Sequence, residues 1–460
     1  MTKLLARLTG HRAAIFNMAM LYAGRTSGVL VAFFFLPLYS RLLGAEQFGM
    51  VAVILSLQAL LMMLDLGMST LITRDVAAGE SSPAGLVKLI RTAEISLSGF
   101  YFILLVGTAA MKTMGGLPGV DFVTALAAVT LFWLLVLHNL YYSAMLARRL
   151  YTSASLIQAV GVIIRASATA FVLANGYATL TAFIATQLTL AAVHCWVTRW
   201  YCMSLLQLRT ALRLKVSKPR LLDGISLINK GRSLVLFSAA GAAVMQLDKP
   251  LVTTFVSAAS VAPYFLATTL CMLPLSILAG PISQYFQPEL LNEVTRKDSE
   301  RTRKTLKRFV TALLLIIGFP CIIFWFLRAP MIDIWMGQSS ENIAISQYVA
   351  ILLPGCAVGA LGFIPYSLLL SEKDFKFQAI LSTCLTLITL SGAAIAARFQ
   401  SVEGVCYVYA AYHSTSTLSS WIRAFFLPPT KDAARYSFLL AAKGSGVLVA
   451  AAMVINYLLK

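Results

Sequence analysis

Residues 15–38 read IFNMAMLYAGRTSGVLVAFFFLPL, an apolar run with one arginine, Arg25, near its middle. At about 1.5 Å of rise per residue, a helix over this run crosses the roughly 30 Å hydrocarbon core of a bilayer. Arg25 would then lie roughly 15 Å from the nearer helix end, where a guanidinium costs about 3 kcal/mol. A second arginine, Arg165, lies inside the apolar run 153–173. We therefore expect a protein that uses positive charge within the membrane.

The composition of the whole chain indicates a helical protein that crosses the bilayer many times. Of 460 residues, 59% are hydrophobic and 12% are charged, and the mean hydropathy is +0.81. These values exclude an ordinary soluble domain, and long apolar runs without alternation argue against a β-barrel. The net charge of +19 comes mostly from loops between apolar runs, which indicates contact with anionic lipid and no nucleic-acid partner.

Apolar segments of spanning length predict twelve core helices and a thirteenth. In the first half they lie near 15–38, 49–73, 94–114, 122–146, 153–175 and 178–202. In the second half they lie near 233–257, 263–288, 306–327, 343–370, 376–397 and 402–426. The additional segment, 437–459, follows Pro428-Pro429.

The two halves resemble each other, which predicts two parallel six-helix lobes around a central cavity. Residues 40–49 (SRLLGAEQFG) occupy the place that residues 253–262 (TTFVSAASVA) occupy in the second half, between its first and second helices. The expected domains are the lobes 1–202 and 233–426, a basic amphipathic cytoplasmic linker at 203–232, and a tail at 427–460 with the thirteenth helix. A solvated basic linker is the alternative for 203–232.

The distribution of Lys and Arg predicts a cytoplasmic N-terminus. With that orientation the cytoplasmic intervals hold the basic clusters, including the stretches 207–232 and 296–308. The opposite loops hold few charges.

The helical neighbours of the two arginines predict faces turned toward protein or water. Arg25 shares its face with Gly28 and Ala32, and Arg165 shares its face with Gln158 and Gly161. One interpretation is a cationic cavity that binds an anionic substrate group. The other is a structural ion pair, with Asp65 as the partner.

Further ionisable residues inside apolar segments are candidates for binding or coupling. In Asp248-Lys249-Pro250, successive residues point about 100° apart, so we expect Lys249 in the cavity and Asp248 paired across the interface of the lobes. Lys249 at the outer surface is the alternative. His138 and His194 could relay a proton or could be buried, hydrogen-bonded histidines. Prolines recur every seven residues along one segment and permit bending; they are Pro274, Pro281 and Pro288.

Short sequence motifs point away from an enzyme. The chain has no glycine-rich nucleotide loop, no zinc-ligand spacing and no nucleophile elbow. We expect neither a cofactor nor a metal, and no catalytic residue.

The residues 34–44 (FFLPLYSRLLG), Phe48-Gly49, Asp65-Leu66-Gly67 and Arg74-Asp75 resemble one particular group of transporters. This group is the polysaccharide branch of the multidrug/oligosaccharidyl-lipid/polysaccharide (MOP) exporter superfamily, the Wzx-like flippases of lipid-linked oligosaccharides. The segment 246–251 resembles the start of the second lobe in the same group.

The resemblance implies a multi-pass protein of the bacterial inner membrane that works by alternating access. Its substrate would be an undecaprenyl-diphosphate-linked oligosaccharide for O-antigen or exopolysaccharide synthesis. Arg25 and Arg165 would bind the diphosphate, with Arg41 near the outer mouth of the cavity and Arg74 near the inner one. A polysaccharide polymerase and the chain-length machinery would be partners.

Two other functions remain open at this stage. A multidrug cation antiporter of the same superfamily would need an excess of acids in its cavity, and this chain offers basic residues instead. A membrane-embedded glycan polymerase or ligase would need catalytic groups on a large outer loop, whereas the outer loops here are short.

Overall fold

The computed structural model is helical in the residues that it describes, which are 2–63, 65, 68–69, 72, 83–115, 120–148, 150–205 and 239–458. The side chains at 2–19, 21–23, 25, 83–84, 375 and 455–458 lie outside this description. Within the described ranges there is no strand, and ten helical stretches are long and apolar enough to span a membrane. The expected all-α, multi-pass membrane protein is confirmed.

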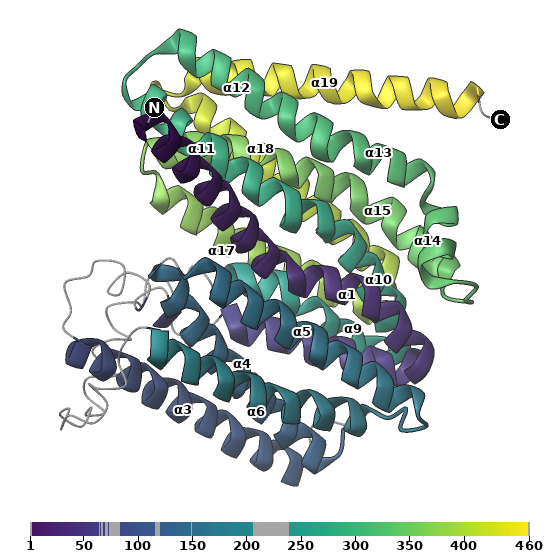
Figure 1. Cartoon of the computed structure of the whole chain (residues 1–460). Helices are drawn as coiled ribbons and strands as arrows, with labels where there is room; N and C mark the ends of the chain where they lie inside the picture. Colours follow the sequence, from purple (N-terminus) through teal and green to yellow (C-terminus); the bar gives the residue numbers. More distant parts are fainter. Residues whose placement is uncertain are drawn as a thin grey trace. The chain divides into compact units, whose positions relative to one another are not determined.

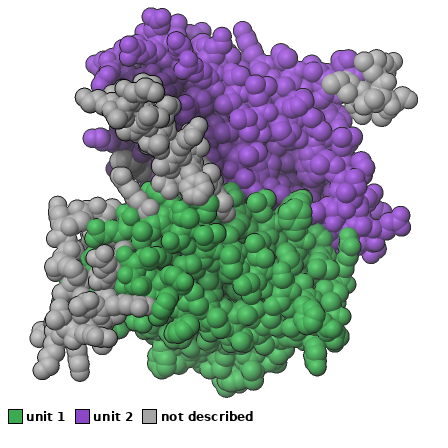
Figure 2. Space-filling view, in the orientation of Figure 1, with its two compact units in different colours: residues 1–242 green, residues 243–460 purple. Residues whose placement is uncertain are grey.

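The chain divides into two compact units, Met1–Ala242 and Ala243–Lys460 (Figure 2). Residues 206–238, which contain most of the expected linker 203–232, lie outside the described residues. The linker and the domain boundaries therefore stay predictions, as does the cavity expected between the two lobes.

Unit 1 is a bundle in which α1 packs along α5, α4 packs along α6, and α5 also contacts α6 (Figure 1). Its helices are α1 (Thr2–Met63), α3 (Pro83–Thr113), α4 (Phe122–Ala147), α5 (Tyr151–Ala174) and α6 (Leu180–Leu205). Because α5 contacts both α1 and α6, polar residues on α5 reach partners on both neighbours.

A glycine separates the first two predicted spans of unit 1. Gly44 lies within α1 with φ 73° and ψ 167°, a left-handed conformation that side chains with a Cβ rarely adopt. At the matching point of unit 2, Ser257 caps α10 by accepting a hydrogen bond from the Ser260 backbone N–H at 3.1 Å. The predicted repeat therefore has a helix break at the same place in each half.

Unit 2 contains a longer series of helices. They are α9 (Asp248–Phe255), α10 (Ala258–Leu273), α11 (Gly280–Thr295), α12 (Ser299–Leu313), α13 (Phe319–Phe326), α14 (Arg328–Met336), α15 (Asn342–Leu361), α16 (Phe363–Ser371), α17 (Phe375–Arg398), α18 (Val402–Phe426) and α19 (Lys431–Leu458). The short helix α14 occupies a stretch that the sequence alone presents as an outer loop.

Two π-helical segments interrupt the spans that follow α9. Pro274–Ala279 connects α10 to α11, and Leu314–Gly318 connects α12 to α13. Pro274 begins the first segment, where its missing N–H removes one hydrogen bond of the regular helix. The proline series permits a bend, and at Pro274 the helix changes locally from α-helical to π-helical hydrogen bonding.

The thirteenth predicted helix is present as α19. It begins at Lys431, six residues before the expected start at 437. Thr430 precedes it, and the Thr430 hydroxyl donates to the Ala424 carbonyl at 2.7 Å, which holds the turn after α18. In unit 2, α19 lies beside α12 (Figure 1).

Candidate functional site

Arg165 is the mid-membrane arginine whose side chain the structure describes. It is half-buried on α5, about 13 Å from the end of the helix at Ala174. The Arg165 Nε is buried and has no hydrogen-bond partner within the described residues. A buried donor without a partner costs about 1–3 kcal/mol, and more when it is charged. The arrangement therefore leaves Arg165 with binding capacity for an anion.

Side chains from α1 and α6 hold the segment of α5 around Arg165. The Tyr39 hydroxyl of α1 donates to the Ala166 carbonyl at 2.9 Å, and this phenol lies within electrostatic range of the guanidinium. From α6, the Gln187 amide donates to the Thr169 hydroxyl at 3.1 Å. In the sequence, Tyr39 is part of the motif 34–44 and has no predicted role. The signal that could have identified it is a hydroxyl group in an otherwise apolar helix.

The two candidate histidines of unit 1 are in contact. The ring centroids of His138 on α4 and His194 on α6 lie 4.0 Å apart, and both side chains are buried. Gly161 on α5 makes room for His194, because a Cβ at Gly161 would lie 2.3 Å from the imidazole. Arg165 lies within electrostatic range of both rings. The two histidines lie on different helices, far apart in the sequence, and the packing of α4, α5 and α6 brings them together.

The hydrogen bonds of His194 define its tautomer. His194 Nε2 lies 3.0 Å from the Ile157 carbonyl, which can only accept, so Nε2 carries the proton. The other nitrogen, Nδ1, is buried and has no partner within the described residues. His194 thus offers one free acceptor in the same region in which Arg165 offers one free donor.

The contacts of His138 define the orientation of a neighbouring amide. The Thr198 hydroxyl donates to the His194 carbonyl at 2.7 Å, so His138 Nδ1 must donate to the Thr198 oxygen at 2.9 Å. A neutral His138 then needs a donor at Nε2, where the Gln158 side-chain amide lies 2.6 Å away. The amide nitrogen of Gln158 must therefore face a neutral ring, because the amide oxygen can only accept.

Asp65, the expected partner of an arginine, lies just after α1 and is half-buried. One oxygen of its carboxylate accepts the Ser69 backbone N–H at 3.1 Å. The Arg25 side chain lies outside the described residues, so an Asp65–Arg25 pair stays a prediction.

Of the two arginines expected at the mouths of the cavity, the structure describes Arg41. Arg41 is exposed on α1, three residues before Gly44. Arg74 lies outside the described residues.

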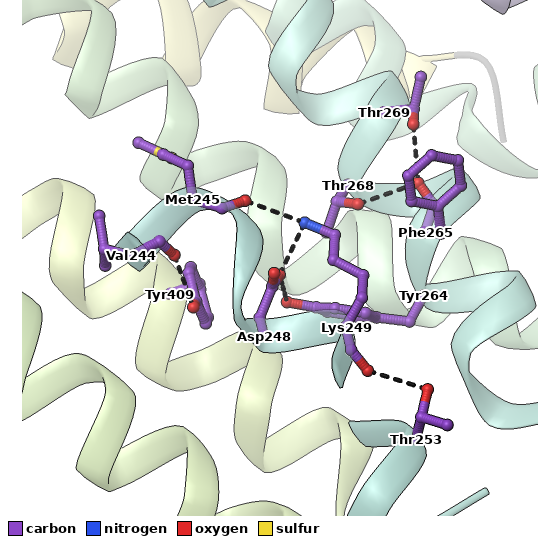
Figure 3. Close-up of polar contacts among 10 residues, drawn as sticks. All are labelled: Val244, Met245, Asp248, Lys249, Thr253, Tyr264, Phe265, Thr268, Thr269 and Tyr409. Carbon is purple, nitrogen blue, oxygen red and sulfur yellow. Dashed lines mark hydrogen bonds and ion pairs between the residues drawn. The ribbon is translucent and has the colours of Figure 1, made fainter. Parts of the chain in front are cut away.

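The adjacent charges of unit 2 form an ion pair with each other (Figure 3). Lys249 Nζ lies 2.8 Å from Asp248 Oδ2, and both side chains are buried. Lys249 Nζ also donates to the Met245 carbonyl at 3.2 Å. Asp248 therefore pairs with its own neighbour, and the buried Lys249 does not lie at the outer surface, whereas Lys249 in the central cavity stays a prediction. The long lysine side chain folds back along the helix and overcomes the 100° offset.

Two tyrosines, Tyr264 and Tyr409, complete this cluster, and the sequence alone gives neither a role. The Tyr264 hydroxyl of α10 donates to Asp248 Oδ2 at 2.6 Å, and the Tyr409 hydroxyl of α18 donates to the Val244 carbonyl at 2.7 Å (Figure 3). Asp248 Oδ1 is buried without a partner among the described residues. These contacts tie α10 and α18 to the two helical stretches that meet at Leu247, just before Pro250.

The described side chains include no group of three His, Cys, Asp or Glu residues placed to hold a metal ion. The polar chemistry of both clusters is that of charge binding and hydrogen bonding.

The fold is that of the MOP superfamily of membrane exporters. The structure is similar to the lipid II flippase MurJ in an inward closed conformation, with a TM-score of 0.71, 12% identity, and coverage of 96% of this chain and 99% of that one. It is also similar to an inward-facing multidrug resistance MATE family transporter, with a TM-score of 0.69, 12% identity, and coverage of 91% and 98%. A MOP superfamily transporter from Pyrococcus furiosus matches with a TM-score of 0.58, 12% identity, and coverage of 88% and 93%.

The sequence itself places the chain in a family. Residues 38–345 match the family described as polysaccharide biosynthesis protein, and the chain belongs to that family. No curated protein matches the sequence. The resemblance to the polysaccharide branch of the superfamily is confirmed.

Proposed function

We propose that the protein is a flippase for undecaprenyl-diphosphate-linked oligosaccharide repeat units. It moves them across the bacterial inner membrane by alternating access, from the cytoplasmic leaflet to the outer one, for O-antigen or exopolysaccharide synthesis. Membership of a polysaccharide biosynthesis family and the exporter fold support the class of cargo and the class of protein.

The observation that carries the proposal is that the buried Nε of Arg165, inside the predicted span α5, has no hydrogen-bond partner among the described residues. A diphosphate cannot enter hydrocarbon unless its charge is compensated. A guanidinium forms strong, bidentate hydrogen bonds to phosphate oxygens, so it lowers this barrier where no water is available. The lipid tail stays in the bilayer, and the sugars follow the headgroup along the polar path.

The charged side chains of the two units support binding of the diphosphate by unit 1 and not by unit 2. In unit 2 Asp248 and Lys249 neutralise each other at 2.8 Å, whereas Arg165 Nε in unit 1 has no hydrogen-bond partner in the part of the chain that the structure describes. We therefore assign the diphosphate to the arginines of unit 1, Arg165 and Arg25. The compensated Asp248 also argues against a cation antiporter, which needs a carboxylate free to exchange cations.

The experiment compares the leaflet distribution of the lipid-linked glycan in a deletion strain and in the same strain carrying the gene. A flippase predicts glycan trapped in the cytoplasmic leaflet without the protein and restored access from the periplasm with it. If the glycan reaches the periplasmic leaflet equally in both strains, the proposal is wrong. Restored efflux of cationic dyes without any change in glycan would instead identify an antiporter.

A further inference from the structure

Arg199, a second arginine of unit 1, has a carboxylate partner, and its side chain is nevertheless partly exposed. Arg199 lies on α6, and its Nε donates to Glu94 Oε1 of α3 at 3.0 Å. The same oxygen accepts the Tyr141 hydroxyl of α4 at 2.6 Å. The Glu94 side chain is 17% exposed, but the Arg199 side chain is 45% exposed. Glu94 thus holds the guanidinium at Nε, while nearly half of the Arg199 side chain stays exposed.

The surroundings of Arg199 combine a hollow with an aromatic surface. A cavity of about 300 Å³ is lined by Glu94, Ser98, Tyr141, Cys195, Trp196 and Arg199. Trp196 is 67% exposed and Trp200 is 48% exposed, one turn before and one residue after the arginine. Exposed tryptophans are enriched where a membrane protein meets the headgroup layer.

The position of Arg199 along α6 matches the depth of the lipid headgroup layer. Arg199 lies six residues before the end of α6 at Leu205, or about 9 Å along the helix. An arginine side chain at this depth can extend toward the interface. Its N–H groups therefore reach the level of lipid phosphates, whereas Arg165 lies too deep for them.

Unit 2 carries a similar arrangement on the corresponding helix of the repeat. Arg423 lies near the end of α18, and its Nε donates to Asp374 Oδ2 at 2.7 Å. The Arg423 side chain is 40% exposed and Asp374 is 15% exposed, and the guanidinium lies 5.3 Å from the Phe377 ring. Exposed lysines at 373, 376 and 431 lie on the neighbouring segments. In both halves, a carboxylate therefore binds an arginine at Nε, and the partly exposed arginine side chain lies near aromatic residues.

We propose that Arg199, and by the repeat Arg423, bind the phosphate group of a membrane phospholipid where α6 and α18 end. Glu94 and Asp374 orient the guanidinium, the outer N–H groups donate to the phosphate, and the neighbouring aromatic side chains pack on the glycerol and the upper acyl chain. Each half has six predicted helices, so both ends lie in the same leaflet, the cytoplasmic one in the predicted orientation. This site is independent of the cargo that the flippase carries.

The test uses the purified full chain in detergent, titrated with dioleoylphosphatidylglycerol and followed by native mass spectrometry. Dioleoylglycerol, which has the same chains and no phosphate, is the control lipid. Arg199→Gln removes the binding charge. Glu94→Gln keeps a hydrogen-bond acceptor for Nε but leaves Arg199 uncompensated. Arg301→Gln is the matched control, because Arg301 also pairs through Nε with a carboxylate, Asp298, at 3.3 Å but is 73% exposed.

The proposal predicts opposite effects for the two partners of the pair. Arg199→Gln should weaken phosphatidylglycerol binding about fivefold, the effect of one basic side chain at an anionic lipid surface. Glu94→Gln should strengthen it, and Arg301→Gln should change it less than Arg199→Gln does. A purely structural ion pair would make Arg199→Gln and Glu94→Gln behave alike. Equal binding by the wild type and Arg199→Gln, or equal binding of dioleoylglycerol, would overturn the proposal.

Discussion

Lys249 Nζ lies 2.8 Å from the carboxylate of its own neighbour, Asp248, and both side chains are buried in unit 2. Removing either charge of a buried ion pair destabilises a protein strongly, because the other charge is left buried and unpaired. The pair also lies at the start of α9, directly after the helix break at Leu247, and Tyr264 of α10 donates to the same carboxylate oxygen. It therefore acts as a fixed joint between helical segments.

The first prediction concerns this pair. Asp248→Asn should destabilise the protein by about 3–5 kcal/mol, because it leaves Lys249 as a buried uncompensated cation. The double variant Asp248→Asn, Lys249→Met should recover most of that loss. Thermal unfolding of the purified variants in detergent measures both effects. A double variant less stable than Asp248→Asn would show that Lys249 does not depend on Asp248.

A second prediction follows from the contact between Gly161 and His194. Gly161→Ala places a methyl group against the imidazole and forces His194 away from the Ile157 carbonyl. Overpacking of this kind costs about 1–3 kcal/mol. Gly107→Ala on α3 is the control, since a Cβ there meets no atom within 4 Å. Gly161→Ala with a melting temperature at or above that of Gly107→Ala would contradict the tight packing of α5 on α6.

A third prediction concerns pH. Asp121 caps α4, and hydrogen bonds from Thr124, first from its side chain and then from its backbone N–H, hold the pKa of the Asp121 carboxyl below its ordinary value. A carboxyl with a lowered pKa in the folded protein stabilises above its unfolded pKa, and this contribution is lost as pH falls through the folded pKa. Asp121→Ala should therefore cost about 1 kcal/mol at pH 7. Unfolding measured at pH 7 and about pH 3 should show the difference shrinking in acid, and a constant difference would contradict the assignment.

The sequence alone predicts the class of fold because the relevant signals are local. Apolar runs of spanning length, positively charged loops and a glycine between two spans each need only neighbouring residues to be recognised. The similarity of residues 40–49 to residues 253–262 predicts the repeat, and the helix breaks at Gly44 and Ser257 lie at the same position in these two segments.

The candidate site depends on contacts that no local pattern contains. His138 and His194 are separate candidates in the sequence, and the packing of α4 on α6 makes them one pair. Glu94 and Arg199 are separated by 105 residues and draw no attention on their own. The adjacent residues Asp248 and Lys249 were misinterpreted because the helical offset describes Cβ directions and ignores the reach of a lysine side chain.

The most direct test of the central claim is the rate at which lipid-linked glycan reaches the outer leaflet in cells that carry Arg165→Gln. Because Arg165 Nε has no protein partner in the described residues, this change should leave protein level and melting temperature unchanged or slightly raised. Flipping should fall about tenfold or more, as expected when a charged hydrogen bond worth about 1.5–3 kcal/mol is lost. Arg165→Lys should recover part of the rate, because it keeps the charge and loses the bidentate geometry.

Arg398→Gln, at the exposed end of α17, is the matched control and should flip at the wild-type rate. The account predicts loss of flipping in Arg165→Gln with the protein still folded in the membrane. Wild-type flipping by a folded Arg165→Gln protein would contradict it.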